Sequence, residues 1–282
     1  ERAWRAARPA SPDRFAAPFE QLWSTDAFGV PLLFLNATAV ETGQRAFVAP
    51  FGVGADAPGR ASFADALDAG AWLGSALPLS TAVHLSARFT YLSPAGRIDT
   101  GRAGAARWRH LVDGGYFDNS GAVTAAEIVN AVLHAHAGLG ATRPIRLIVL
   151  HLPNEPVDAD ATASDWSGGH RVLGEMLDPV RALLATRVAR GTQAVAALRR
   201  EHEREPRVRL LGIAPCRLQA ALPLGWVLSA QVRRDLRTQV RSCRGVGAGC
   251  AADRVAAVRA LLARGDAAPL EPLYDSGPRC GG

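Results

Sequence analysis

Several residue types that often define a function are scarce in this chain of 282 residues. It has no lysine, one methionine and four cysteines, and aromatic residues make up 6% of it. Without lysine it cannot carry the phosphate-binding P-loop, whose lysine reaches the nucleotide phosphates. No run approaches the ~18 consecutive apolar residues that a membrane-spanning helix needs, and the start of the chain does not resemble a signal peptide. The compartment stays open between the cytoplasm and the surface of a membrane.

The cysteines and histidines do not form a metal-binding pattern. The four cysteines are Cys216, Cys243, Cys250 and Cys280. No two of them form the Cys-x-x-Cys pair typical of structural zinc. Cys243 and Cys250 flank the loop CRGVGAGC, where a disulfide in an oxidising compartment and a pair of free thiols both stay open. His134 and His136 are two residues apart and would point to different sides of a helix. We therefore expect no metal and no cofactor.

The positive charge alone does not define a partner. The formal net charge is +6 and the sequence pI is about 9.9, with every full positive side-chain charge on arginine. Arginine usage in a GC-rich genome and attraction to anionic lipid or nucleic acid both explain this balance. The stretch RREHEREPRVR, 199–209, mixes the two signs and is typical of an exposed helix end. We therefore expect no nucleic-acid partner.

Apolar patterning predicts an α/β fold. The sequence is 48% apolar, which is enough for a sizeable core. Strands are predicted at PLLFLNATAV (31–40) and QRAFVAPF (44–51), joined by a turn-like ETG, and at WRHLVDGG (108–115), IRLIVLHL (145–152) and RVRLLGI (207–213). The run 145–152 has the continuous apolar character of a strand buried on both faces.

Helices are predicted between and after these strands. They cover 61–89, divided by Pro78, then 120–138 with Asn119 or Ser120 as N-cap, 171–200, 222–240 and 253–265, with FEQLW (19–23) also helical and 97–110 a basic loop. Alternating strands and helices favour a mostly parallel sheet with helices on both faces. We expect one domain over residues 19–265, an irregular lead-in at 1–18 and an irregular tail at 266–282.

One short motif carries a chemical suggestion. In LVDGGYFDNSGAV, 111–123, Asp113 ends a predicted strand and is followed by Gly114 and Gly115. Two glycines permit a positive φ and close approach of another backbone, and the carboxyl ends of parallel strands are where such sheets form sites. A turn stabilised by an Asx-type hydrogen bond explains the same three residues. Both interpretations stay open from these residues alone.

The surrounding segments resemble a known family. DGGYFDNSG follows PLLFLNATAVETGQR and LSARFTYLSPAG and precedes LPLGWVLS. In this order the four segments are similar to those of bacterial patatin-like phospholipases, over roughly residues 19–240. The resemblance implies a three-layer α/β/α domain that hydrolyses acyl esters, often of lipids, without a metal. It implies that Asp113, with Gly114 and Gly115, is the base that takes the proton of a nucleophilic Ser directly. It also gives Asn119 and Asn36 supporting roles at the edge of the sheet where the Asp-Gly-Gly turn is expected.

Half of the expected machinery is missing. The family carries its Ser in a GxSxG elbow behind a Gly-rich oxyanion segment, and neither occurs in this sequence. Ser75, Ser80 and Ser86 lack the flanking glycines, and Ser120 follows the Asp motif too closely. The chain begins with ERAWRAARPASPDRF and without Met. We expect it to be the C-terminal portion of an acyl hydrolase domain, whose missing N-terminal segment supplies the first strands and the Ser. An inactive binding module on the same fold is the alternative.

Two further segments bear on the substrate. Arg97, Arg102, Arg107 and Arg109 precede the Asp-Gly-Gly turn. They would meet lipid phosphates at the mouth of a pocket or form a solvated basic loop. LPLGWVL, 222–228, would contact a membrane interface or pack in the core. The resemblance implies a lipid or another acyl ester as the partner, and peripheral membrane contact stays open.

Overall fold

The chain folds into two compact units, which are described separately. The computed structural model describes residues 15–23, 31–50, 60–74, 76–89, 93–140, 144–153, 171–203, 205–213, 229–241 and 251–264, and the single residues 6, 13 and 52. The first unit lies within residues 1–145 and 180–201, and the second within 146–179 and 202–282.

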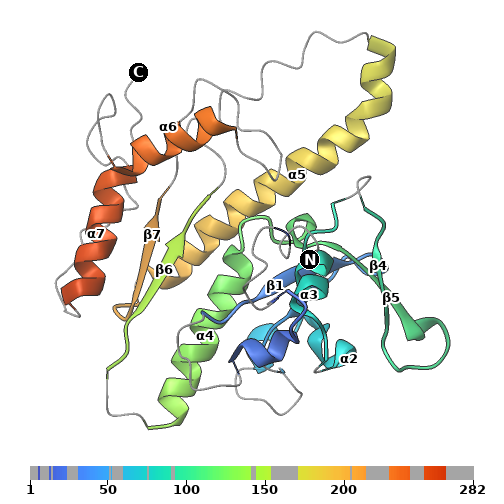
Figure 1. Ribbon diagram of the computed structural model, residues 1–282, viewed down its shortest axis with the longest axis horizontal. Coiled ribbons are helices and arrows are strands. Elements are labelled where there is room, and N and C mark those ends of the chain that lie inside the picture. The colour runs from blue at the N-terminus through green and yellow to red at the C-terminus, as the bar shows by residue number, and fades with distance from the viewer. Residues whose placement is uncertain are drawn as a thin grey trace. The chain divides into compact units, whose positions relative to one another are not determined.

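Figure 1 labels most of the helices and strands of both units. In the first 145 residues, with η for a 3-10 helix, they are η1 (Phe19–Trp23), β1 (Leu35–Ala39), β2 (Arg45–Val48), η2 (Arg60–Phe63), β3 (Leu67–Asp68), α2 (Gly70–Leu73), α3 (Leu79–Ser86), β4 (Gly96–Asp99), η3 (Gly104–Arg107), β5 (Trp108–Asp113), η4 (Gly114–Tyr116) and α4 (Ala122–Gly138). They are followed by β6 (Leu147–His151), α5 (Arg171–His202), β7 (Val208–Gly212), α6 (Ala230–Arg241) and α7 (Ala251–Arg264).

A curled five-stranded sheet organises the first unit, in the order β3-β2-β1-β5-β4 (Figure 1). Strand β1 pairs antiparallel with β2 and β5, β4 pairs antiparallel with β5, and only β2 and β3 are parallel. The expected α/β class is confirmed, with a mixed sheet. The described strands do not confirm a mostly parallel, three-layer arrangement, because hairpins rather than helical crossovers join β1 to β2 and β4 to β5.

The predicted hairpin is present, with its strands at Leu35–Ala39 and Arg45–Val48. Gly43 has a φ of +67°, which suits the turn between β1 and β2. All four residues of β2 are buried. Val48 packs in a cluster with Leu85 of α3, whereas Phe47 packs on the opposite face of the strand near Ile128 of α4. Side chains of α3 and α4 therefore cover opposite faces of β2.

Helix α4 begins two residues later than predicted, and its cap is different. The N-cap position is Gly121, whose φ is +69° and which has no side chain to cap the helix. Asp118 instead accepts hydrogen bonds from the amides of Val123 at 3.5 Å and Thr124 at 3.0 Å. Ser120, one of the two expected caps, accepts from the amide of Ala122 at 3.2 Å, whereas the contact described for Asn119 is with Arg187.

The second unit contains a two-stranded parallel sheet, β6-β7, and the helices α6 and α7. The strands align Leu147 with Val208. Both were predicted, but burial of β6 on both faces was wrong, since the side chains of Ile148 and Leu150 are exposed. The buried Arg254 of α7 donates to the carbonyl oxygen of Gly212, 2.8 Å away, and so holds the end of β7.

Two predicted segments between the strands were also wrong in part. Residues 61–89 contain the short elements η2, β3 and α2 before Pro78, and only α3 after it is a helix of eight residues. The segment 97–110 was expected to be a loop, but it contains most of β4, all of η3 and the start of β5. Residues 171–202 form a single helix. The four cysteines, LPLGWVL and the tail lie outside the described residues. Among the helices that are described, none has the length and apolar character to cross a membrane.

Candidate active site

Asp113 is the last residue of β5, and its backbone is bonded on both sides. Its register partner on β1 is Ala37. Its amide donates to the carbonyl oxygen of Arg88 at 3.0 Å, and its own carbonyl oxygen accepts from Thr38 Oγ1 at 3.1 Å. Because both backbone polar groups are bonded, the turn starts from a fixed position. The predicted placement of this carboxylate at the end of a strand is confirmed.

Both glycines after Asp113 make close contacts, Gly114 with backbone atoms and Gly115 with the ends of side chains. A Cβ on Gly114 would lie 2.3 Å from the carbonyl oxygen of Asn36 and 2.5 Å from its carbonyl carbon. A Cβ on Gly115 would lie 2.5 Å from Arg187 Nη2 and 2.9 Å from Asp113 Oδ1. Neither glycine has a positive φ. Of the two reasons that the sequence offered for a Gly pair, close approach therefore applies and left-handed backbone does not.

The carboxylate of Asp113 is held through one oxygen. Oδ1 accepts a hydrogen bond from the amide of Gly115 at 2.7 Å and lies 3.8 Å from Arg187 Nη2. The Asp113 side chain is 21% exposed, so it is partly shielded from water and still reachable. In the described part of the chain Oδ2 takes part in no hydrogen bond. The geometry leaves that oxygen available to accept a proton from a neighbouring group.

Arg187 of α5 is the residue at this site that the sequence did not reveal. Its Nε donates to the carbonyl oxygen of Gly115 at 2.7 Å, and its Nη2 donates to Asn119 Oδ1 at 3.2 Å. Its guanidinium carbon lies 5.3 Å from the centre of the Tyr116 ring and 5.7 Å from that of Phe89. Nothing local to position 187 separates it from the other arginines of the chain, so no sequence signal could have identified it.

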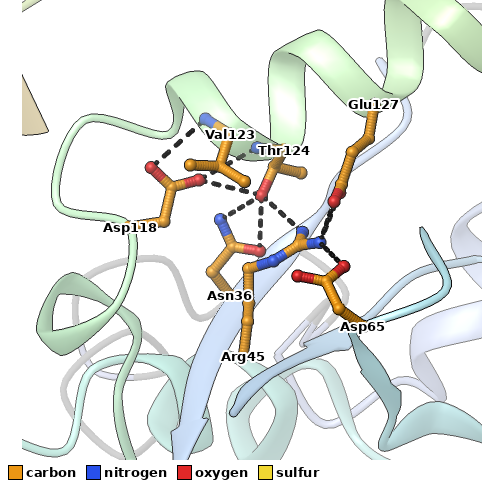
Figure 2. Close-up of polar contacts among 7 residues, drawn as sticks. All are labelled: Asn36, Arg45, Asp65, Asp118, Val123, Thr124 and Glu127. Carbon is orange, nitrogen blue, oxygen red and sulfur yellow. Dashed lines mark hydrogen bonds and ion pairs between the residues drawn. The ribbon is translucent and has the colours of Figure 1, made fainter. Parts of the chain in front are cut away.

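Asn36 lies at the same rim, in a buried polar cluster between β1, β2 and α4 (Figure 2). Its amide nitrogen donates to Thr124 Oγ1 at 2.8 Å, and the buried Arg45 donates to the same oxygen at 3.0 Å. Asp118 Oδ2 accepts from that hydroxyl at 3.0 Å. The carbonyl oxygen of Asn36 accepts from Ser86 Oγ at 2.5 Å. Asn36 therefore joins α3 and α4 to the strand on which Gly114 rests.

A buried ion pair completes this cluster. Arg45 is fully buried and contacts the Glu127 carboxylate directly, with Asp65 a further 3.9 Å partner (Figure 2). Burial raises the pKa of Glu127 to about 7, although the adjacent Arg45 guanidinium acts to lower it. The cluster ties α4 to the strands beside the Asp113 turn, and none of its carboxylates contacts Asp113.

The other residues that were considered for chemistry are placed elsewhere. His110 Nδ1 lies 2.6 Å from Glu41 Oε1, so this imidazole is paired with the β1–β2 turn. Arg107 pairs with Asp99 at 2.9 Å, and Arg97 stacks 3.7 Å above the Trp108 ring. These arginines lie on the β4–β5 hairpin, toward the opposite end of β5 from Asp113.

No Ser, Thr or Cys side chain among the described residues bonds the Asp113 carboxylate. Ser86 donates to Asn36, and Ser120 Oγ lies 3.4 Å from Asp118 Oδ1. Ser75 lies outside the described residues. Among the residues that are described, no group of three or more His, Cys, Asp or Glu side chains could hold a metal ion.

The arrangement offers a carboxylate with one oxygen bonded to the Gly115 amide and one that no described residue bonds, at the end of a strand and beside Gly114, which lies against the β1 backbone. Such a group can orient a hydroxyl and accept its proton. The sequence motifs alone carry the family resemblance, because comparisons of the chain with protein-family models, curated proteins and solved structures gave no match.

Proposed function

We propose that this chain carries the base of a Ser–Asp lipid acyl hydrolase of the patatin-like type. Asp113 is the base, and the Ser and the oxyanion donors come from a segment of the same protein outside these 282 residues. The intact domain would then have the three-layer α/β/α arrangement with a mostly parallel central sheet. The observation that carries the proposal is the Asp113 carboxylate, whose Oδ1 is bonded to the Gly115 amide while Oδ2 has no hydrogen bond with any described residue.

In the proposed reaction Asp113 acts as the base in both halves. The Ser hydroxyl passes its proton to Asp113 Oδ2 as its oxygen attacks the ester carbonyl. The alcohol leaves with that proton, and an acyl-enzyme remains. Water then attacks the acyl group and gives a proton to Asp113, which returns it to the Ser oxygen as the carboxylic acid is released. The chemistry uses neither a metal nor a cofactor, and the substrate is a lipid or another carboxylic ester met in the cytoplasm or at a membrane surface.

The first experiment is to translate the DNA upstream of the Glu1 codon in frame. A GxSxG behind a Gly-rich segment supports the proposal, and a stop codon directly before the chain contradicts it. The intact product is then assayed for hydrolysis of short-chain and long-chain acyl esters and for labelling by a fluorophosphonate.

Asp99 provides a matched control for Asp113. It ends β4, its Oδ1 accepts from the amide two residues later, in Gly101, at 3.0 Å, and its Oδ2 pairs with Arg107 at 2.9 Å. We expect Asp113→Asn to lower kcat by about 100-fold or more, the usual scale for a lost general base, and Asp99→Asn to leave it unchanged. Comparable ester hydrolysis by Asp113→Asn and the wild type would overturn the proposal.

An inactive binding module is the second candidate, and the turn contacts of Asp99 favour it. Asp99 makes the same kind of turn contacts with no expected catalytic role, so such contacts also serve a purely structural turn. This candidate predicts that the intact product binds vesicles containing acyl esters, does not hydrolyse them and is not labelled by the fluorophosphonate.

A further inference from the structure

The contacts of Arg187 differ in kind from those of a surface ion pair. At the comparable Asp99 turn, the pairing Arg107 is only eight residues away and its side chain is 55% exposed. Arg187 comes from a helix 72 residues beyond Gly115, and its side chain is 16% exposed. Holding a long, partly buried side chain in one geometry is unfavourable unless its donors are satisfied. At this site they bond to the turn.

The guanidinium bonds Gly115 and Asn119 and lies near the Asp113 carboxylate. Nε donates to the Gly115 carbonyl oxygen, and Nη2 donates to Asn119 Oδ1 while lying 3.8 Å from Asp113 Oδ1. Gly115 is in turn bonded through its amide to Asp113 Oδ1. One planar group therefore bonds the carbonyl side of Gly115, and the Asp113 carboxylate bonds the amide side.

We propose that Arg187 is a positioning residue that locks the Asp113-Gly114-Gly115 turn. It keeps Oδ1 of Asp113 turned toward the Gly115 amide, so that Oδ2 faces the reacting hydroxyl. This role in the reaction rests on the proposed function, whereas the locking of the turn does not. It assigns a part in the site to α5, a helix that follows the Asp motif by more than fifty residues.

An arginine suits this position better than a lysine. The two acceptors, Gly115 O and Asn119 Oδ1, are reached by different nitrogens of one rigid fork. A lysine ammonium is a single point on a flexible stem and cannot reproduce that pair of directions. The rings of Phe89 and Tyr116 also lie within the range in which a guanidinium is attracted to an aromatic face.

Arg190 supplies a matched control on the same helix. It lies three residues further along α5, its guanidinium carbon is 4.5 Å from the centre of the Phe117 ring, and its side chain is exposed. No hydrogen bond or ion pair is described between Arg190 and the Asp113 turn. Arg190→Ala removes a similar cation and a contact with the Phe117 ring, but no described bond to Asp113, Gly114 or Gly115.

The test measures hydrogen exchange at the Gly115 amide and steady-state kinetics in the intact product. We expect Arg187→Ala to speed exchange at Gly115 by about 10-fold or more, because local opening of the turn becomes easier. We expect it to lower kcat by about 100-fold with little change in KM, the scale that follows a misplaced catalytic group. Arg190→Ala should change neither.

Arg187→Lys, which keeps the charge and guards against misfolding of the alanine variant, should recover little of the kcat. Added guanidinium ion should restore part of the Arg187→Ala activity where ammonium ion does not.

The outcomes separate this inference from the proposed function. Unchanged exchange at Gly115 in both Arg187 variants overturns the inference, whatever the activity. Faster exchange with an unchanged kcat, in a protein that Asp113→Asn inactivates, overturns the positioning role and leaves the proposed function standing. If Asp113→Asn is fully active, the proposed function fails, and exchange at Gly115 alone decides whether Arg187 locks the turn.

Discussion

Replacement of Gly114 by alanine tests the contact between the Asp113 turn and β1 directly. The added Cβ would lie 2.3 Å from the carbonyl oxygen of Asn36, 2.5 Å from its carbonyl carbon and 2.8 Å from its Cβ, where ordinary van der Waals contacts are 3.4–4 Å. The obstacle is mainly backbone, so no side-chain rotation relieves it.

The strand that carries Asn36 has little freedom to move away. Strand β1 is paired with β2 on one side and β5 on the other, and the Asn36 side chain is bonded to Thr124. Overpacking of a close-packed site costs typically ~1–3 kcal/mol. Because three contacts are shorter than 3.0 Å and two of them are with backbone atoms, we expect Gly114→Ala to lose about 3 kcal/mol of unfolding free energy.

Gly138 provides the control in the same unit. A Cβ there meets nothing within 4 Å, and Gly138 is the last residue of α4. Gly138→Ala is expected to leave stability unchanged or raise it by up to about 1 kcal/mol, since alanine loses less backbone entropy in a helix. Urea unfolding followed by circular dichroism and tryptophan fluorescence measures both variants. A Gly114→Ala protein within about 0.5 kcal/mol of wild type, well below the usual overpacking cost, would show that the turn does not rest on Asn36.

Two further predictions concern the buried polar cluster. Asp118→Ala removes the acceptor of the buried Thr124 amide, whereas the Thr124 hydroxyl keeps Asn36 Oδ1 at 3.0 Å as an acceptor, so the loss is expected to be about 1–2 kcal/mol. Asp118→Asn, which keeps one acceptor oxygen, should lose less in the same urea titration, and equal stability of Asp118→Ala and wild type would contradict the capping role. The pKa of the Glu127 carboxyl is about 7 in the folded protein, above its ordinary value of 4.5. Between these two pH values the folded state keeps a proton on Glu127 that the unfolded state has lost. Unfolding free energy should therefore fall as pH rises from about 4.5 to about 7. In Glu127→Gln this slope should be smaller, and an identical slope in both proteins would show that Glu127 does not titrate in this range.

The local parts of the fold could be predicted from the sequence. The ETG turn between two apolar runs specified the β1–β2 hairpin, and the Asp-Gly-Gly bend marked the end of β5. Strand β4 was missed because it has only four residues, of which just Gly96 and Ile98 are buried. The strand direction was misjudged because alternating strands and helices favour parallel pairing, whereas three of the four strand pairs in this sheet are antiparallel.

The candidate site was predictable only as far as it is continuous in sequence. Asp113, Gly114 and Gly115 form one motif, and close backbone approach was a stated reason for the glycines. In Asp118-Asn119-Ser120 any of the three side chains suits a helix cap. The left-handed backbone of Gly121 and the position of the Thr124 amide determine that Asp118 is the side chain that caps α4. Arg187 acts across 72 residues from Gly115, a separation that no local pattern records.

The buried Arg45 has a consequence for how α4 finds its place on the sheet. The apolar side chains that α4 buries fully, Ala122 and Val129, are small and would pack in more than one register. The Arg45 guanidinium is compatible with only one of these registers, because Thr124 and Glu127 must both face it. Sliding the helix by one turn would leave that cation buried without its carboxylate, at a cost of about 3–5 kcal/mol. The polar cluster therefore selects the register of α4, and through Asn36 it sets the level at which the Asp113 turn meets the sheet.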